Sequence, residues 1–403
     1  MFYAHKLKNT CNFCAIIILS QIMKVCNMKY EKADITFTGD IMCSPNMTKL
    51  ANNNYSSIFQ RAYKLKNCDY LVGNLETPIA GQDMKFTHER YCFNTPESYL
   101  AALKECGFNL LTLANNHCMD RDEQGIINTL KNCHNAGFDT VGIYASAEER
   151  NTIFIKELNG IKVAFINYTY GTNAFAHHKF LKQPYMVNLS QPEETLPGSI
   201  HLLNSYEKIE NEVERIYTHG KDFELVKPYL DQLESDIRRA KSAADYVIVI
   251  MHSGSQYIRE VDPYSLFLTD KIKQFGADII IGHHQHLIQS CLTDGDGYFK
   301  IFCLGNFMCD GKIEADDFYF DSPLFNAVFH LSLSRSDDGS IQEKKSFSIY
   351  TTVKDKLGLP CAIDSYDVYK KSNETYLREK ILRYANWFAG SNKYRNVQEY
   401  YEL

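Results

Sequence analysis

The chain has 403 residues, of which 45% are hydrophobic and 23% charged, a composition typical of soluble globular proteins. Its net charge of -6 provides no electrostatic basis for binding nucleic acid, so we expect no nucleic-acid partner. The 13 cysteines are scattered singly apart from Cys11 and Cys14, which favours buried, reduced thiols over a disulfide framework or a structural zinc site.

Residues 1–32 are interpreted as a leader that does not belong to the folded domain. Basic residues precede a short apolar run, "CAIIIL", which is too short to span a bilayer. No small-residue cleavage site follows before Asp34. We therefore favour a cytoplasmic protein and interpret this stretch as a non-structural leader that arises from an upstream start codon before Met28. The alternative is a signal or anchor in this stretch, with a membrane-associated or exported product.

From residue 33 onward, strand patterns alternate with helix patterns. The apolar runs predict strands over 33–39, 69–74 and 108–114, and amphipathic helices over 55–66, 96–107 and 122–137. This alternation is typical of an α/β protein.

The second half begins with a predicted hairpin over 152–170, which turns at Asn159-Gly160. A polar stretch over 173–219 is interpreted as an insertion, with a helix candidate over 205–217. Further helices are predicted over 226–243 and 264–276, further strands over 245–251, 277–282 and 299–307, and β structure over 324–353. We expect one domain over 33–354, followed by a helical C-terminal tail over 355–403.

Polar side chains follow five of the predicted strands. They are Asp40, Glu76, the run Asn115-Asn116-His117, His252, and the cluster His283, His284 and His286. Ligands bind at the carboxyl ends of strands in open α/β sheets, so these residues are expected at one sheet edge. Carboxylate, amide and imidazole groups without cysteine suit a divalent metal ion better than a structural zinc site.

Each of these residues also has a purely structural interpretation. Asp40 could cap a turn, and Glu76 could be an exposed loop acid. His252 could be a half-buried histidine that binds no metal. Asn115 and Asn116 are natural turn residues. The histidine cluster is more specific, because on a strand His284 and His286 point to the same side and could reach one ion.

Six ordered motifs resemble the CapA family of capsule-biosynthesis proteins: "FTGDIM", "VGNLETP", "LTLANNHCMDRDEQGIINTL", "MHSGSQY", "ADIIIGHHQHLIQ" and "CLGNF". The resemblance covers about residues 34–307. It implies a calcineurin-like metallophosphoesterase fold, a four-layered αββα sandwich, with two divalent metal ions between the sheet edges. It also implies a role in poly-γ-glutamate capsule synthesis.

The resemblance further implies a role for each matching residue. Asp40 corresponds to a ligand of the first metal, and Glu76 takes the place of the acid that bridges both metals. Asn116, His252 and His284 match ligands of the second metal. His286 matches a further ligand of the first metal. His117 resembles the catalytic histidine, with Asn116 beside it neutralising developing charge. His283 ranks below His284, because the family motif also begins with Gly-His-His.

Three departures from the family pattern bear on the site. Met42 stands where ordinary phosphoesterases have a second metal-binding histidine, and Gln285 replaces the usual proline between the last histidines. Ser253 follows His252 where many members have tryptophan. The other expected metal ligands are all present. The departures leave the choice of substrate and the occupancy of one metal site undetermined.

The expected activity is metal-dependent hydrolysis of a phosphoester, with His117 protonating the leaving oxygen and manganese, iron or zinc as cofactor. Hydrolysis or transfer of a γ-glutamyl amide in the capsule polymer is an alternative with the same site. A non-catalytic accessory subunit of a polymer synthesis or export complex is a second alternative. The expected partners are a phosphoester or γ-glutamyl polymer substrate and a membrane-bound capsule synthesis complex.

Overall fold

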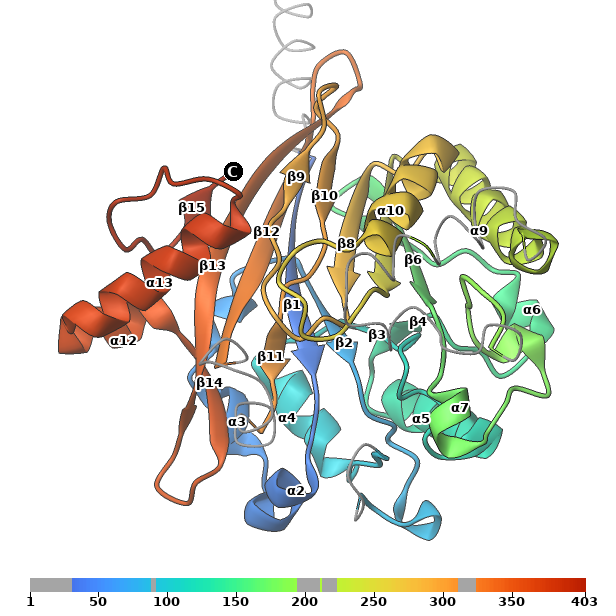
Figure 1. Ribbon diagram of the computed structural model, residues 1–403, viewed down its shortest axis with the longest axis horizontal. Coiled ribbons are helices and arrows are strands. Elements are labelled where there is room, and N and C mark those ends of the chain that lie inside the picture. Colours follow the sequence, from blue (N-terminus) through green and yellow to red (C-terminus); the bar gives the residue numbers. More distant parts are fainter. Residues whose placement is uncertain (1–30, 88–91, 194–210, 212–222, 311–323) are drawn as a thin grey trace, which may run out of the picture.

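The computed structural model describes residues 31–87, 92–193, 211, 223–310 and 324–403. In this part of the chain, two mixed β-sheets form the frame and helices pack against them (Figure 1). The predicted α/β class is therefore confirmed at the level of a mixed α/β protein with two sheets. The predicted helix over 205–217 lies outside the described residues, apart from residue 211.

The larger sheet has nine strands among the described residues. Its main path runs through β14 (Pro360–Asp364), β13 (Ile341–Lys354), β12 (Phe325–Arg335), β1 (Lys32–Ile41), β2 (Tyr70–Leu75), β3 (Leu110–Thr112) and β4 (Asp139–Val141). Two short strands join from the side: β11 (Asn306–Met308) pairs with β1, and β15 (Tyr401–Glu402) pairs with β13.

The C-terminal region is less helical than expected. Helices α12 (Ser365–Ser372) and α13 (Thr375–Phe388) are present, but β14 and β15 both pair with β13. The boundary expected at residue 354 thus falls inside the β13–β14 hairpin, and the tail completes the larger sheet. Short strands of this kind carry little hydrophobic periodicity, so the sequence pattern did not reveal them.

The smaller sheet has six strands in the described part of the chain. Their order is β5 (Ile155–Leu158), β6 (Ile161–Thr169), β7 (Tyr246–His252), β8 (Ile279–His283), β10 (Phe299–Ile301) and β9 (Leu292–Thr293). The β5–β6 hairpin turns at Asn159 and Gly160, which both have positive φ angles, as predicted. The central strands β7 and β8 are parallel and buried at every position, which explains their uninterrupted apolar runs.

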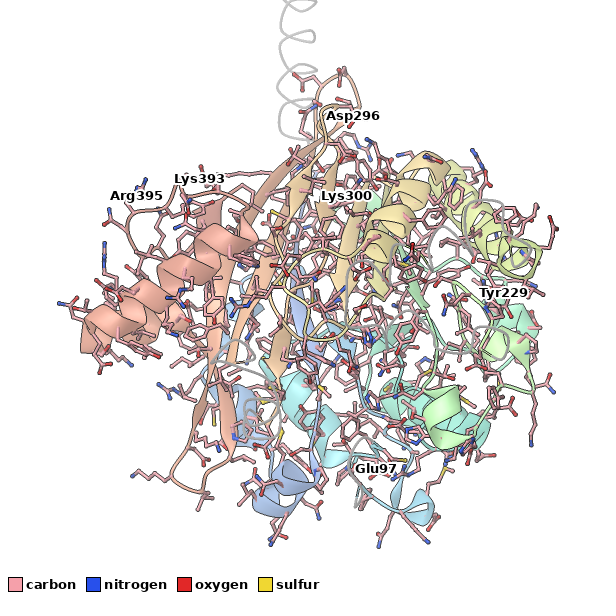
Figure 2. All side chains as sticks on the ribbon, viewed as in Figure 1. Glu97, Tyr229, Asp296, Lys300, Lys393 and Arg395 are labelled. Carbon is pink, nitrogen blue, oxygen red and sulfur yellow. The ribbon has the colours of Figure 1, made fainter. Side chains whose placement is uncertain are left out.

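A lysine is buried on the smaller sheet. Lys300 of β10 is 2% exposed, and its ammonium group pairs with the carboxylates of Asp270 and Asp294. Lys273 in turn pairs with Asp294 and Asp296, at 2.7 Å each. These five residues are called the Lys300 cluster, of which Figure 2 labels Lys300 and Asp296.

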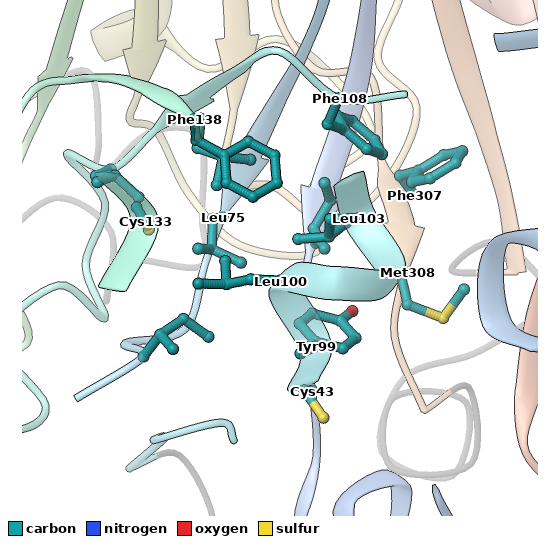
Figure 3. Packing of buried hydrophobic residues seen from close by; sticks show 14 of the residues in the cluster. Cys43, Leu75, Tyr99, Leu100, Leu103, Phe108, Cys133, Phe138, Phe307 and Met308 are labelled. Atoms are coloured by element: carbon teal, nitrogen blue, oxygen red, sulfur yellow. The ribbon is translucent and has the colours of Figure 1, made fainter. Parts of the chain in front are cut away.

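The remaining helices cover the outer faces of the two sheets. α2 (Pro45–Ala51), α3 (Ser56–Gln60), α4 (Ser98–Cys106) and α5 (Asp122–Asn135) contribute to one hydrophobic cluster with the larger sheet, and α9 (Phe223–Ala243) and α10 (Pro263–Phe275) to another with β6, β7 and β8. Figure 3 shows Leu100 and Leu103 of α4 beside Phe307 and Met308 of β11 in the first cluster. A third cluster combines Phe37 and Tyr70 of the larger sheet with Phe165 of the smaller.

The prediction of one continuous helix over residues 55–66 is wrong. α3 ends at Gln60, and a 3-10 turn over Tyr63–Lys66 follows it. The backbone changes to shorter-range bonding there, since the Ala62 amide donates to the Phe59 carbonyl at 2.9 Å. The amphipathic pattern persists through both pieces, which is why the two appear as one helix in the sequence.

The two sheets are joined beside their strand ends by the segment over residues 302–305, between β10 and β11. A Cβ on Gly39 of β1 would lie 1.9 Å from the Gly305 carbonyl oxygen, and one on Gly282 of β8 would lie 1.9 Å from the Phe302 carbonyl oxygen. Only glycine permits these backbone approaches. The residues that follow the two glycines, Asp40 and His283, are therefore held at fixed positions.

Two smaller observations complete the fold. Within the described ranges, none of the helices combines the length and the apolar character needed to cross a bilayer. The short helix α6 (Ala147–Arg150) contacts β6 through Arg150, whose guanidinium donates to the Tyr168 hydroxyl at 2.8 Å. The short helix α7 (Ala174–His177) follows β6 and belongs to the described part of the predicted insertion.

Candidate metal centre

The polar residues predicted at the strand ends gather at one place between the two sheets. Asp40 is the last but one residue of β1, and Glu76 directly follows β2. His252 and His283 end β7 and β8. The strands were expected to share one sheet edge, but β1 and β2 belong to the larger sheet and β7 and β8 to the smaller. The site therefore lies where the edges of two sheets meet.

Five side chains form two groups whose ligand atoms could each surround a metal ion. Glu76, His252 and His284 form one group, and Asp40, Glu76 and His286 form the other, with all ligand atoms of a group within 4.8 Å of one another. All five residues are buried. Glu76 belongs to both groups, so its carboxylate could contribute to both of them.

The distances within each group are short enough for shared ligation. His252 Nε2 lies 3.5 Å from Glu76 Oε1 and 3.1 Å from His284 Nδ1. His286 lies between the two carboxylates, with Nδ1 3.3 Å from Asp40 Oδ2 and Nε2 3.8 Å from Glu76 Oε1.

The geometric argument for pairing His284 with His286 is wrong, although both side chains reach the site. β8 ends at His283, and His284 and His286 have φ angles of 102° and 59°. Alternation along a strand therefore does not apply, because the chain turns sharply after β8. The turn sends His284 toward His252 and His286 toward Asp40. His283 also contacts Asp40, at 3.1 Å, but is in neither group.

Gln285, the residue that departs from the family pattern, holds the loops together. Its side-chain Nε2 donates to the Ser253 backbone carbonyl at 2.7 Å, and its backbone carbonyl accepts from the Tyr257 backbone amide at 2.9 Å. Gln285 thus links the loop after β7 to the loop after β8. This position fixes the backbone beside His252 and His284.

Two asparagines orient the ligands, and the sequence analysis missed this role. Asn74 Nδ2 donates to Asp40 Oδ1 at 2.7 Å, and Asn306 Oδ1 lies 2.8 Å from His286 Nδ1. A hydrogen bond to one ring nitrogen leaves the other nitrogen of a histidine available to a metal. Asn306 lies in the "CLGNF" motif and is paired with Asp40 between β11 and β1, so the motif was a usable signal.

Asn116 and His117 lie beside the two groups. Asn116 Oδ1 is 2.8 Å from His252 Nε2, and its Nδ2 donates to Asn173 Oδ1 at 3.2 Å. His117 Nδ1 is 2.8 Å from Asp120 Oδ2, which also accepts from the Phe93 amide at 2.6 Å. Asp120 was not predicted, although its spacing of three residues from His117 could have indicated it.

Burial and charge act on the site in opposite directions. Burial alone would raise the pKa of Asp40, but hydrogen bonds from His283 and His286, together with charge on His283, outweigh it and hold that pKa well below its usual value. Burial lowers the pKa of His252 well below its usual value, against the attraction of Asp40. Asp40 is therefore ionised and His252 neutral near pH 7, the forms in which both ligate metals.

Met42 occupies the position where a further histidine ligand was noted as missing. It is 7% exposed and packs in a small cluster with Phe93 and Cys309. The Phe93 ring of this cluster lies 4.5 Å from the His117 ring, measured between centroids.

The fold and this centre define a mixed α/β protein with two buried groups of His, Asp and Glu side chains that could hold metal ions. The family model described as "Bacterial capsule synthesis protein PGA_cap" matches residues 34–311, and the chain belongs to this family. The resemblance to the CapA family is thereby confirmed.

Two curated relatives are similar over the same region. The capsule biosynthesis protein CapA of Bacillus anthracis is 28% identical over 285 residues, 70% of this chain and 60% of the relative. The PGA biosynthesis protein CapA of Bacillus subtilis (strain 168) is 27% identical over 280 residues, 68% of this chain and 63% of the relative. The similarity thus spans less than two thirds of the length of these relatives.

Proposed function

We propose that the protein is a metal-dependent phosphoester hydrolase that acts in the synthesis of a poly-γ-glutamate type of capsule. The observation that carries the proposal is the place of Glu76 in both groups of potential ligands. A shared carboxylate between two ligand sets suits a two-metal site. We further propose that the two sheets with their outer helices form a four-layered αββα sandwich of the metallophosphoesterase type.

The donor set fits two divalent cations such as manganese, iron or zinc. Asp40, Glu76 and His286 would hold one ion, and Glu76, His252 and His284 the other, with the Asn116 amide oxygen beside the second. When bound, two such ions supply positive charge to the phosphoryl oxygens and lower the pKa of a water molecule.

The protein's own residues would orient the substrate and supply a proton. Asp120 binds Nδ1 of His117, so this carboxylate fixes the ring and leaves Nε2 as the nitrogen that faces a reactant. His117 Nε2 is the group that we assign to protonate the leaving oxygen. The Asn116 amide is assigned to stabilise charge that develops in the transition state.

A γ-glutamyl amide is the second candidate substrate, since the printed name of the Bacillus subtilis relative refers to PGA biosynthesis. The same centre could activate water against an amide carbonyl. A non-catalytic accessory role in a capsule synthesis or export complex at the membrane is the third. For the cellular location we favour the cytoplasm, with a membrane-associated or exported form as the alternative.

Metal analysis of the purified full chain, followed by turnover assays, separates these candidates. We expect about two ions per chain and hydrolysis of phosphomonoesters or phosphodiesters with manganese. Release of glutamate from γ-glutamyl peptides without phosphoester turnover would replace the phosphoesterase by the amide-cleaving activity. If the chain binds no stoichiometric metal, both enzymatic activities are ruled out and the accessory role is favoured. Asp40→Ala is the matched inactive control.

A further inference from the structure

The described start of the predicted insertion lies beside the metal centre and contacts Asn116 and Asp120. Residues 172–183, called the α7 segment, contain α7 and follow β6 closely. Asn173 accepts a hydrogen bond from Asn116 Nδ2 at 3.2 Å. His177 Nε2 lies 3.6 Å from Asp120 Oδ1, the carboxylate oxygen that does not bind His117. The segment therefore contacts Asn116 itself and the carboxylate partner of His117.

The Asp120 carboxylate is shared between two imidazoles. Its Oδ2 binds His117 and the Phe93 amide, while its Oδ1 faces His177. Asp120 Oδ1 and His177 Nε2 are both buried atoms, and among the described residues neither has a hydrogen-bond partner. A buried polar atom left unsatisfied is costly, so each atom is the natural partner of the other, at a distance just beyond a normal hydrogen bond.

Contacts with α5 and with Glu193 anchor the α7 segment. The backbone amides of Lys182 and Gln183 donate to Glu123 Oε1 at 2.7 and 2.8 Å. Glu193 accepts from the Leu181 amide at 3.0 Å and from the hydroxyl of Thr172. The segment is thus tied down on both sides of His177. A side chain on such a support can hold a neighbour in place.

We propose that His177 is a positioning residue that acts on His117 through Asp120. Through the 3.6 Å contact of its Nε2 with Asp120 Oδ1, His177 restricts the plane of the carboxylate, and the carboxylate in turn holds the His117 ring. This inference rests on the proposed phosphoesterase function for its kinetic consequence and assigns a task to the start of the insertion. It adds no new group to the ligand sets.

Leaving-group dependence tests the proposal in the manganese-loaded full chain. An alkyl phosphate requires a proton on its leaving oxygen, whereas 4-nitrophenyl phosphate requires little help. His177→Ala is therefore expected to lower kcat for the alkyl ester roughly tenfold while changing kcat for the nitrophenyl ester less than about twofold. His177→Gln is expected to recover most of the loss, because its amide can donate to Asp120. The neighbouring exposed His178→Ala is the matched control and should behave as wild type.

Equal losses on both esters in His177→Ala would overturn the proposal, because they would indicate a general structural effect. A variant with wild-type kcat on both esters would overturn it as well.

A second measurement does not depend on activity. In the full chain with 15N-labelled histidine rings, the Nδ1–H resonance of His117 is assigned by its loss in His117→Asn. We expect His177→Ala to shift or broaden this resonance and His178→Ala to leave it in place. An unchanged resonance in His177→Ala would overturn the proposal even if the chain hydrolyses phosphoesters. A shifted resonance in a chain without phosphoesterase activity would retain the positioning role and reject the proposed function.

Discussion

Asp40 and Lys300 are both buried charged residues, but their surroundings differ. Lys300 is surrounded by the carboxylates of Asp270 and Asp294, so permanent charges of opposite sign compensate one another within the Lys300 cluster. Asp40 and Glu76 share their surroundings with imidazoles, of which His252 is held neutral. The neutral imidazole of His252 offers a lone pair and no compensating charge. The Lys300 cluster therefore contains its own cationic groups, two lysines beside three aspartates, whereas the metal centre is suited to an added cation.

The strongest test of this difference is Glu76→Gln. Because Glu76 belongs to both ligand groups, we expect the variant to lose both ions, with metal affinity reduced roughly 100-fold or more. Elemental analysis after dialysis measures the stoichiometry. Unfolding of the metal-free variant should resemble that of the metal-free wild type. Retention of two ions would show that Glu76 is not a shared ligand.

The two groups can be separated by removing one histidine at a time. We expect His284→Ala to lose the ion held with His252, and His286→Ala to lose the ion held with Asp40, so that each variant retains about one ion per chain. Circular dichroism serves as the control for folding. Unchanged metal content in both variants would contradict the assignment of these histidines.

Lys300→Ala tests the other side of the comparison. The side chain is buried and its stem is packed, so we expect the free energy of unfolding to fall by about 3 kcal/mol, with no change in metal content. Lys300→Met keeps the stem and should cost about 1 kcal/mol, because water can still reach the Asp270 carboxylate. Urea unfolding at pH 7 measures both values. A change in metal stoichiometry would show that the two regions are coupled.

His330 shows how an imidazole behaves among hydroxyls rather than carboxylates. It lies 3.1 Å from Thr36 Oγ1 and 3.0 Å from Ser348 Oγ, and burial lowers its pKa to about 4. In the unfolded chain the imidazole of His330 is protonated near pH 6.5, whereas in the folded chain it is not protonated until about pH 4. The free energy of unfolding therefore falls as the pH decreases from 6.5 toward 4. Between pH 7 and pH 5 we expect a loss of about 2 kcal/mol from this residue.

Comparing urea midpoints of wild type and His330→Gln at the two pH values checks this smallest effect. The variant should lose less stability than wild type on acidification. An identical loss in both proteins would mean that His330 does not titrate differently on unfolding.

The sequence predicted the centre best where a buried strand ends in a polar residue. Asp40, Glu76 and His252 were found in this way, because an apolar run of period two or a continuous run is visible without the fold. The division of the strands between two sheets was not visible, since pairing partners lie far apart in sequence. The turn after β8 was also missed, because His284 and His286 adopt positive φ angles that no local pattern of histidines indicates.

Residues that support the centre from other elements could not be predicted from spacing. Asn306 comes from β11 and His177 from the α7 segment, and only folding brings them to His286 and Asp120. Asp120 is the exception, since it lies only three residues after its partner His117. The strands β14 and β15 were missed for a related reason: their few residues form strands only because β13 offers an edge.

The segment over residues 302–305 has a consequence for how the protein matures. Gly39 and Gly282 allow it to lie against both sheets, and one sheet provides the acidic ligands while the other provides the imidazoles. Neither sheet alone contains a complete ligand set from the two groups. Under the proposed function, metal uptake would therefore report that the two halves have docked correctly, and a chain that carried two ions would have completed its assembly.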